Sequence, residues 1–175
     1  DLFLNDDFQV PELDEEHDFY LIQADPKLAD IVRENPKVLN TLKKNISKLD
    51  EYFDFSIADT APSLSLVMTG ALLVADYVMS PIELEEYSID GITKMLQTIF
   101  GVKSKWNPDL MFLGMLPNRF NSRSERQKIT LQSLLDNYAN LMIPAKIGIR
   151  DSIPESLSLG IPVWELKKTA ARVAS

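Results

Sequence analysis

The chain has 175 residues, of which 45% are apolar and 25% charged, an ordinary balance for a globular protein. It has no cysteine, which excludes disulfides and thiolate metal sites, and its one histidine argues against a Ser-His-Asp hydrolase. The formal net charge of −8 means that contact with nucleic acid would need a local basic patch. No apolar run approaches the roughly 18–20 residues that cross a bilayer.

Short, almost continuously apolar runs recur along the chain and predict buried strands of a parallel sheet. They cover residues 19–22, 53–57, 77–79, 110–116 and 146–149. We expect the third run to end at Ser80-Pro81, since proline lacks the N–H that a sheet interior needs.

Between these runs, apolar residues at helical spacing predict helices. The helices cover residues 27–33, 36–49, 63–73, 88–100, 122–141 and 167–174, with a helical turn at 154–159. We expect Asn35, Ser63 and Ser122, the last with Glu125 as a capping box, to cap the helices that follow them. Because strands and helices alternate without a linker, we predict one α/β domain over 1–175, a three-layer, mostly parallel sheet flanked by helices.

In open parallel sheets, ligands bind at the carboxyl ends of the strands. Asp59 follows the second predicted strand and would place a carboxylate at that rim. Such a carboxylate orients magnesium and its waters in phosphate-binding NTPases. It could instead cap the helix that follows, which is the more common use of an aspartate in this place.

Four segments together resemble the ParA/MinD family of partition ATPases. The stretch from Phe53 to Leu64 resembles the Walker B segment, with Ala61 where the first proline is usual. Residues 74–81 resemble the alanine-Asp, strand, Pro segment that comes next in the family. Residues 87–92 resemble its Ser-Leu-x-Gly-Leu helix start, and 149–163 its C-terminal signature. The resemblance implies a P-loop NTPase-like fold.

The resemblance covers roughly residues 18–172 and also implies parts that this sequence lacks. The family begins with a strand and a deviant Walker A loop, glycine-rich with two lysines, whose amides bind phosphates. The six glycines here are too far apart to form such a loop. We therefore expect an N-terminal segment of roughly 40–60 further residues, carrying the first strand and the P-loop, in the native protein. The alternative is a stand-alone variant with a rearranged sheet.

The resemblance also implies cofactors and roles. ATP and Mg²⁺ would be bound, with Asp59 catalytic and holding magnesium through water, and Thr60 beside it at the nucleotide. Asn118, Arg119 and Pro154 are implied to contact the nucleotide. In MinD-like relatives an Asn like Asn118 reads the adenine edge, which suits an amide because it both donates and accepts hydrogen bonds. The residues alone leave open that Asn118 only forms a turn.

One dense basic cluster lies at the start of the helix 122–141. It consists of Arg119, Arg123, Arg126 and Lys128. The resemblance implies DNA contact for this cluster, since Arg123 matches a position that relatives use. Arg150 lies near a second such position, although Ser152 aligns better with the arginine used there. On charge alone, a solvated helix start explains the cluster equally well.

The function implied by the resemblance is plasmid or chromosome partition by a cytoplasmic, nucleoid-associated ATPase. Its ATP-dependent homodimer would bind DNA without sequence preference, and a ParB-type partner would stimulate hydrolysis. The chain by itself is expected to be inactive. Two alternatives stay open: a nucleotide-independent interaction or dimerisation module, and a MinD-like division-site regulator. MinD-like proteins end in a basic amphipathic membrane helix, and 167–175 is too short for one, so no membrane partner is expected.

Overall fold

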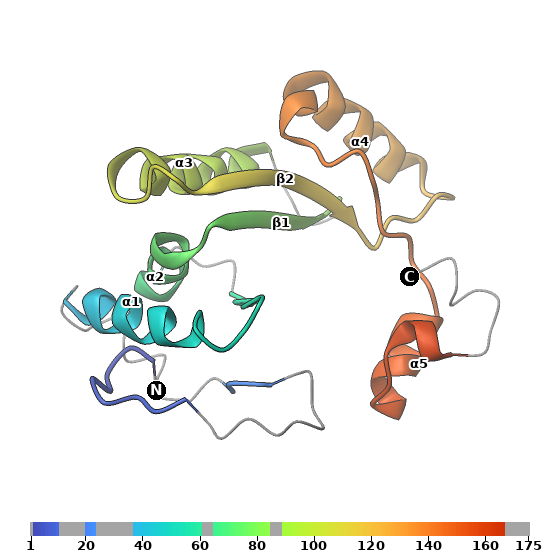
Figure 1. Ribbon diagram of the computed structural model, residues 1–175. Helices are drawn as coiled ribbons and strands as arrows, with labels where there is room; N and C mark the ends of the chain where they lie inside the picture. The colour runs from blue at the N-terminus through green and yellow to red at the C-terminus, as the bar shows by residue number, and fades with distance from the viewer. Residues whose placement is uncertain (1, 11–19, 24–36, 61–64, 85–88, 167–175) are drawn as a thin grey trace. The chain divides into compact units, whose positions relative to one another are not determined.

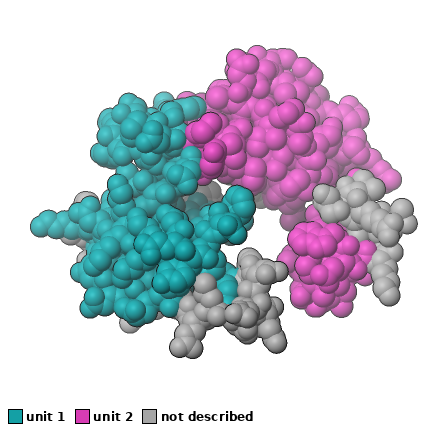
Figure 2. Space-filling view, viewed as in Figure 1, with its two compact units in different colours: residues 1–76, 97–110 teal, residues 77–96, 111–175 magenta. Residues whose placement is uncertain are grey.

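The computed structural model describes residues 2–10, 20–23, 37–60, 65–84 and 89–166. The chain forms two compact units, which we describe one at a time (Figure 2). Unit 1 comprises residues 1–76 and 97–110, and unit 2 comprises residues 77–96 and 111–175. Helix α3, Ile89–Lys105, contributes residues to both units. None of the helices in the described part of the chain is long and apolar enough to cross a membrane.

Unit 1 contains α1, Val38–Leu49, and α2, Leu66–Val74 (Figure 1). The predicted amphipathic pattern of α1 is confirmed, because Leu42 and Leu49 are buried whereas Lys43 is exposed. The two helices approach closely at Gly70 of α2. A Cβ there would lie 2.9 Å from the Leu42 side chain and 3.0 Å from Phe3, so only glycine fits without a shift.

The segment 2–8 lies on α1 and is held there by side chains of the helix. Asn45 is fully buried and donates to the carbonyls of Leu2 and Asn5 at 2.9 and 2.8 Å. One turn further along α1, Lys48 donates to the carbonyl of Phe8 at 2.9 Å. An irregular segment is thus fixed by hydrogen bonds to its main chain, without forming a helix or strand.

The helix ends of unit 1 differ in detail from the predicted caps. α1 begins at Val38, and its N-cap Lys37 makes no side-chain cap hydrogen bond, whereas the predicted cap Asn35 lies outside the described residues. α2 is capped by Ser65, which accepts from the Met68 amide at 3.3 Å, and the predicted cap Ser63 also lies outside them. The predicted elements at 27–33 and 167–174 likewise fall outside the described residues.

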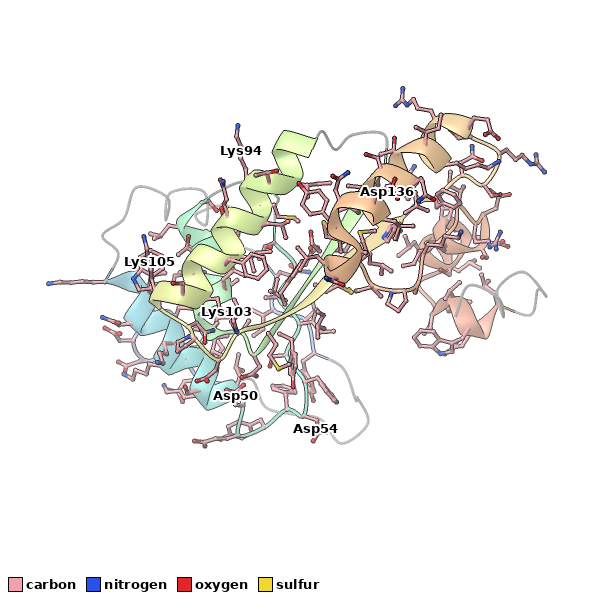
Figure 3. All side chains as sticks on the ribbon, turned by 90° about the horizontal axis from the view of Figure 1, so that it is seen from above. Asp50, Asp54, Lys94, Lys103, Lys105 and Asp136 are labelled. Carbon is pink, nitrogen blue, oxygen red and sulfur yellow. The ribbon has the colours of Figure 1, made fainter. Side chains whose placement is uncertain are left out.

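Polar side chains at and just after the end of α3 bind main-chain carbonyls of unit 1. Asn107 donates to the carbonyls of Leu72 and Ala75 at 2.9 and 2.8 Å and so satisfies acceptors at the C-terminus of α2. Lys103 donates to the carbonyls of Pro108 and Leu110 (Figure 3). These bonds fix the turn that leads from α3 into the next strand.

The described part of unit 2 contains two parallel strands, β1, Tyr77–Glu83, and β2, Met111–Asn118 (Figure 1). Both were predicted, and the parallel pairing is confirmed. The expected end of β1 at Ser80-Pro81 is wrong, because the strand continues to Glu83, with Pro81 paired in register with Leu116. In a two-stranded sheet each strand has a free edge, where the missing N–H of proline costs no ladder hydrogen bond.

Beyond β2, the predicted strand 146–149 does not form a regular strand. Isolated bridges join Met115 to Met142 and Phe120 to Gly148 instead. The close approach depends on Gly114, whose φ is +125° and whose missing Cβ would lie 3.0 Å from the Leu141 carbonyl oxygen. The segment 142–149 therefore runs beside the carboxyl half of β2 without completing a ladder.

The predicted strand 53–57 is wrong: residues 53–60 are irregular and largely exposed. The side chains of Phe55 and Ile57 are 88% and 93% exposed. A strand is stable only where a neighbour accepts its backbone hydrogen bonds, and no described residue pairs with this segment. The described part of the first predicted strand, 20–22, is irregular as well.

Helices pack on the strand pair to form the core of unit 2. The remaining helical elements are α4, Glu125–Tyr138, η2, Ala139–Leu141, α5, Ser152–Leu159, and η3, Val163–Glu165. The buried core residues are Ile82, Leu84, Ile92, Leu96, Met115, Phe120 and Leu134, from β1, α3, β2 and α4 and the turns beside them. This is the α/β arrangement expected, a parallel strand pair flanked by helices.

Candidate functional site

The carboxyl ends of β1 and β2 coincide. Glu83 and Asn118 are register partners at the last step of the parallel ladder, so both lie at one edge of the sheet. Asn118 is half-buried, and its Oδ1 accepts from the Arg119 amide at 2.9 Å. Because only the oxygen of an amide can accept, this bond fixes which end of the Asn118 side chain is the donor.

Arg119 follows β2 in a left-handed conformation, with φ 52°. Such a conformation costs a residue with a Cβ about 1–2 kcal/mol, so the surrounding bonds must hold it. Its guanidinium Nε lies 3.5 Å from a carboxylate oxygen of Glu83. The two side chains are 70% and 37% exposed, so the ion pair contributes at most about 1 kcal/mol.

Phe120 anchors the loop that follows β2. Its side chain is buried, its amide donates to the Ile147 carbonyl at 2.9 Å, and its carbonyl accepts from the Ile149 amide at 3.2 Å. Lys146 lies over the Phe120 ring, 4.6 Å from its centroid. These contacts place the segment 146–150 beside the loop that carries Arg119.

The basic loop 119–124 is fixed by its own polar side chains. The Asn121 carboxamide accepts from the Arg123 amide at 3.0 Å, and Gln127, which is buried, accepts from the Asn121 amide at 2.6 Å. Ser124 caps α4 by accepting from the Gln127 amide at 3.3 Å. The predicted capping box at Ser122 is therefore wrong, since the turn at Asn121 moves the start of the helix by two residues.

The predicted basic residues are all exposed and lie in unit 2. Arg123 is on the fixed loop, and Arg126 and Lys128 are in the first turn of α4, where Lys128 also pairs with Glu125 at 2.6 Å. Arg150 lies on the neighbouring segment, two residues from the Phe120–Gly148 bridge. Two segments distant in sequence therefore bring their cations to the same edge.

Two residues at this edge were missed by reasoning from the sequence. Lys146 stood inside a predicted strand and outside the dense basic cluster. Only the bridge from Phe120 to Gly148 shows that Lys146 lies beside that cluster. Glu83 lay beyond the expected end of β1. A strand continued through Pro81 would have revealed Glu83 at the carboxyl edge.

The C-terminal signature residues are on or beside α5. Pro154 is exposed in the first turn of this helix. Ser152, at the first helical position, is only 5% exposed, and its hydroxyl has no hydrogen-bond partner within the described part of the chain. A buried side chain cannot reach a DNA backbone, so the structure gives Ser152 no part in the basic edge.

Asp59 and Thr60 belong to unit 1, whereas the other predicted site residues belong to unit 2. Both are exposed and form the end of the irregular segment 53–60, which is not a strand. In the described residues no three Asp, Glu or His side chains lie close enough together to hold a metal ion. The expected role of Asp59, a single carboxylate that holds magnesium through water, does not need such a cluster and stays a prediction.

A parallel strand pair flanked by helices makes this an α/β protein, the class of fold in which ligands bind at the carboxyl ends of the strands. Comparisons with known proteins narrow this class. Residues 10–112 match the family model described as an AAA domain. Protein IncC of Escherichia coli is 46% identical over 156 residues, which are 89% of this chain and 43% of IncC. The chromosome partitioning protein ParA of Myxococcus xanthus is 26% identical over 91% of this chain and 59% of its own length.

Solved structures show the same fold. Cobyrinic acid a,c-diamide synthase from Mycobacterium smegmatis, with bound ADP and magnesium, superposes with a TM-score of 0.64 at 27% identity, covering 78% of this chain and 62% of that one. Apo McdA from Cyanothece gives a TM-score of 0.69 at 20% identity, covering 86% of this chain and 66% of that one. This chain belongs to the ParA/MinD-like AAA domain family. It spans less than half the length of IncC.

Proposed function

We propose that this chain is the greater part of the single nucleotide-binding domain of a partition ATPase. The intact protein binds Mg-ATP, forms a homodimer, and binds DNA without sequence preference in the cytoplasm, on the nucleoid. A ParB-type partner stimulates hydrolysis. The observation that carries the DNA step is the fixed cationic edge of unit 2, to which two segments contribute exposed Arg123 and Arg150.

The cationic edge suits a phosphate backbone more than a particular base sequence. Arg123, Arg126 and Lys128 come from one loop and helix start, and Arg150 and Lys146 from the neighbouring segment. Cations held on short, fixed segments can neutralise several phosphates at once and release their counterions. The net charge of −8 makes such a local patch necessary, since the chain as a whole repels DNA.

DNA binding is tested on the intact, ATP-loaded protein with Arg123→Glu. Affinity for a random-sequence duplex should fall on the order of tenfold, and the slope of log affinity against log salt should decrease by about one, because a phosphate contact is lost. Lys43→Glu, at an exposed position of α1, is the matched control and should leave both unchanged. Unchanged binding by Arg123→Glu would remove this edge from the DNA site.

The nucleotide step is tested by magnesium-dependent ATP turnover of the intact protein. Asp59→Ala should abolish turnover, whereas Asp50→Ala, at the exposed end of α1, should not (Figure 3). The chain of residues 1–175 alone should show no turnover. An intact protein that dimerises without nucleotide and hydrolyses none would instead be the interaction module, and one that binds vesicles would be the MinD-like regulator.

A further inference from the structure

We propose that Glu83 is a positioning residue that makes the site prefer adenine over guanine, acting through Arg119 and Asn118. This inference rests on the proposed nucleotide-binding function and concerns the same edge of unit 2. It starts from the register of the sheet, which places Glu83 directly opposite Asn118 at the ends of β1 and β2.

The first link runs from Glu83 to Arg119. The Glu83 carboxylate holds the Arg119 guanidinium at 3.5 Å, across the end of the strand pair. Arg119 is also the one residue other than glycine with positive φ in the described part of the chain, so its backbone needs support from its surroundings. The ion pair anchors the side chain of a residue whose backbone is strained.

The second link runs from Arg119 to Asn118. In the left-handed conformation, the Arg119 amide donates to the Asn118 Oδ1 at 2.9 Å. The Asn118 carboxamide is therefore held in one of its two orientations, with Nδ2 as donor and Oδ1 keeping one free lone pair. If Arg119 relaxes, this bond is lost and the carboxamide can rotate by half a turn.

The consequence concerns the base edge that the amide can pair with. Adenine presents a donor, N6, beside an acceptor, N7, and one asparagine amide pairs with both. Guanine presents two acceptors, N7 and O6, on the same edge, and these need two donors. An asparagine amide offers one donor and one acceptor, so it favours adenine. An amide that is already held in the pairing orientation loses less freedom when adenine binds, so releasing it weakens the adenine pair and lowers the preference.

The test measures ATP and GTP dissociation constants of the intact protein by competition against a fluorescent nucleotide. Glu83→Gln keeps the shape of the side chain but not its charge, and should reduce the preference for ATP over GTP about two- to fivefold, mainly by weakening ATP. Glu125→Gln, which removes the carboxylate that pairs with Lys128, is the matched control and should leave the ratio unchanged.

A double-mutant cycle tests the route through Arg119. Arg119→Gly retains the amide and adopts positive φ without strain, and it removes the partner of Glu83. Glu83→Gln should then have no further effect on the nucleotide ratio in this background. An undiminished effect of Glu83→Gln there would overturn the inference.

Other outcomes separate the inference from the proposed function. If Asn118→Ala lowers the ATP/GTP ratio but Glu83→Gln does not, the positioning role is wrong and the nucleotide site stands. If Glu83→Gln weakens ATP and GTP equally, its effect is only structural and the inference also fails. An intact protein that binds neither nucleotide would overturn the proposed function itself.

Discussion

β1 and the segment 53–60 are short apolar stretches that occur in different surroundings. β1 pairs with β2 over its whole length, and its residue Ile82 is fully buried. The segment 53–60 has no strand beside it in the described structure, and its Ile57 is 93% exposed. Both sequences favour a strand, so the difference comes from the availability of a neighbour and not from β-propensity.

The same contrast applies to the functional residues at the end of the strand pair and at the end of the segment 53–60. Asn118, at the end of β2, is oriented by Arg119 and lies opposite Glu83. Asp59, near the end of the segment 53–60, is exposed and does not lie at the end of a strand in the described structure. A site residue is positioned only where the element beneath it is formed. The part of the relatives that this chain does not span is therefore where we expect the support for Asp59 to come from.

The largest expected effect comes from replacing the buried isoleucine of β1 and comparing it with the exposed isoleucine of the segment 53–60. Ile82→Ala removes a fully buried side chain from the core of unit 2 and should lower the free energy of unfolding by about 2–5 kcal/mol. Ile57→Ala removes an exposed side chain and should change it by less than about 0.5 kcal/mol. Urea unfolding of the two variants measures both. Equal destabilisation would show that the segment 53–60 is packed in solution and that the contrast is wrong.

An intermediate effect is expected at the segment 2–8, which is irregular like 53–60 but fixed. Asn45→Ala removes the two hydrogen bonds to the carbonyls of Leu2 and Asn5 and should destabilise the protein by about 1–3 kcal/mol. Amide hydrogen exchange in residues 2–8 should become faster. The control is Asn40→Ala, an exposed position of α1. If exchange is unchanged in Asn45→Ala, these bonds do not hold the segment.

Much of the fold could be predicted because local patterns decide it. The apolar spacing of α1, α3 and α4 and the continuous apolar run of β2 depend on residues close in sequence. The prediction of a strand at 53–57 was wrong because a strand needs a partner that local sequence does not specify. The end of β1 was predicted too early. Proline ends a strand only where a neighbouring strand would need its missing N–H, and Pro81 is not at such a position.

The site could be predicted only in part for the same reason. Asn118, Arg119 and Arg123 follow one strand and are visible in one stretch of sequence. Glu83 and Lys146 come from other segments, and their place depends on the β1–β2 register and on the bridge from Phe120 to Gly148. Contacts between distant segments are set by packing, which no local pattern encodes.

The smallest expected effect concerns the start of α4, after the strand that does form. Two serines compete for the cap: Ser124 accepts from the Gln127 amide at 3.3 Å, whereas Ser122 is exposed in the preceding turn. Ser124→Ala should therefore cost about 1 kcal/mol, and Ser122→Ala almost nothing. Because the cap also fixes the loop of Arg123, Ser124→Ala should weaken DNA binding of the intact protein slightly. A larger loss of stability in Ser122→Ala would restore the capping box at Ser122 and move the start of α4, and with it the loop that presents Arg123.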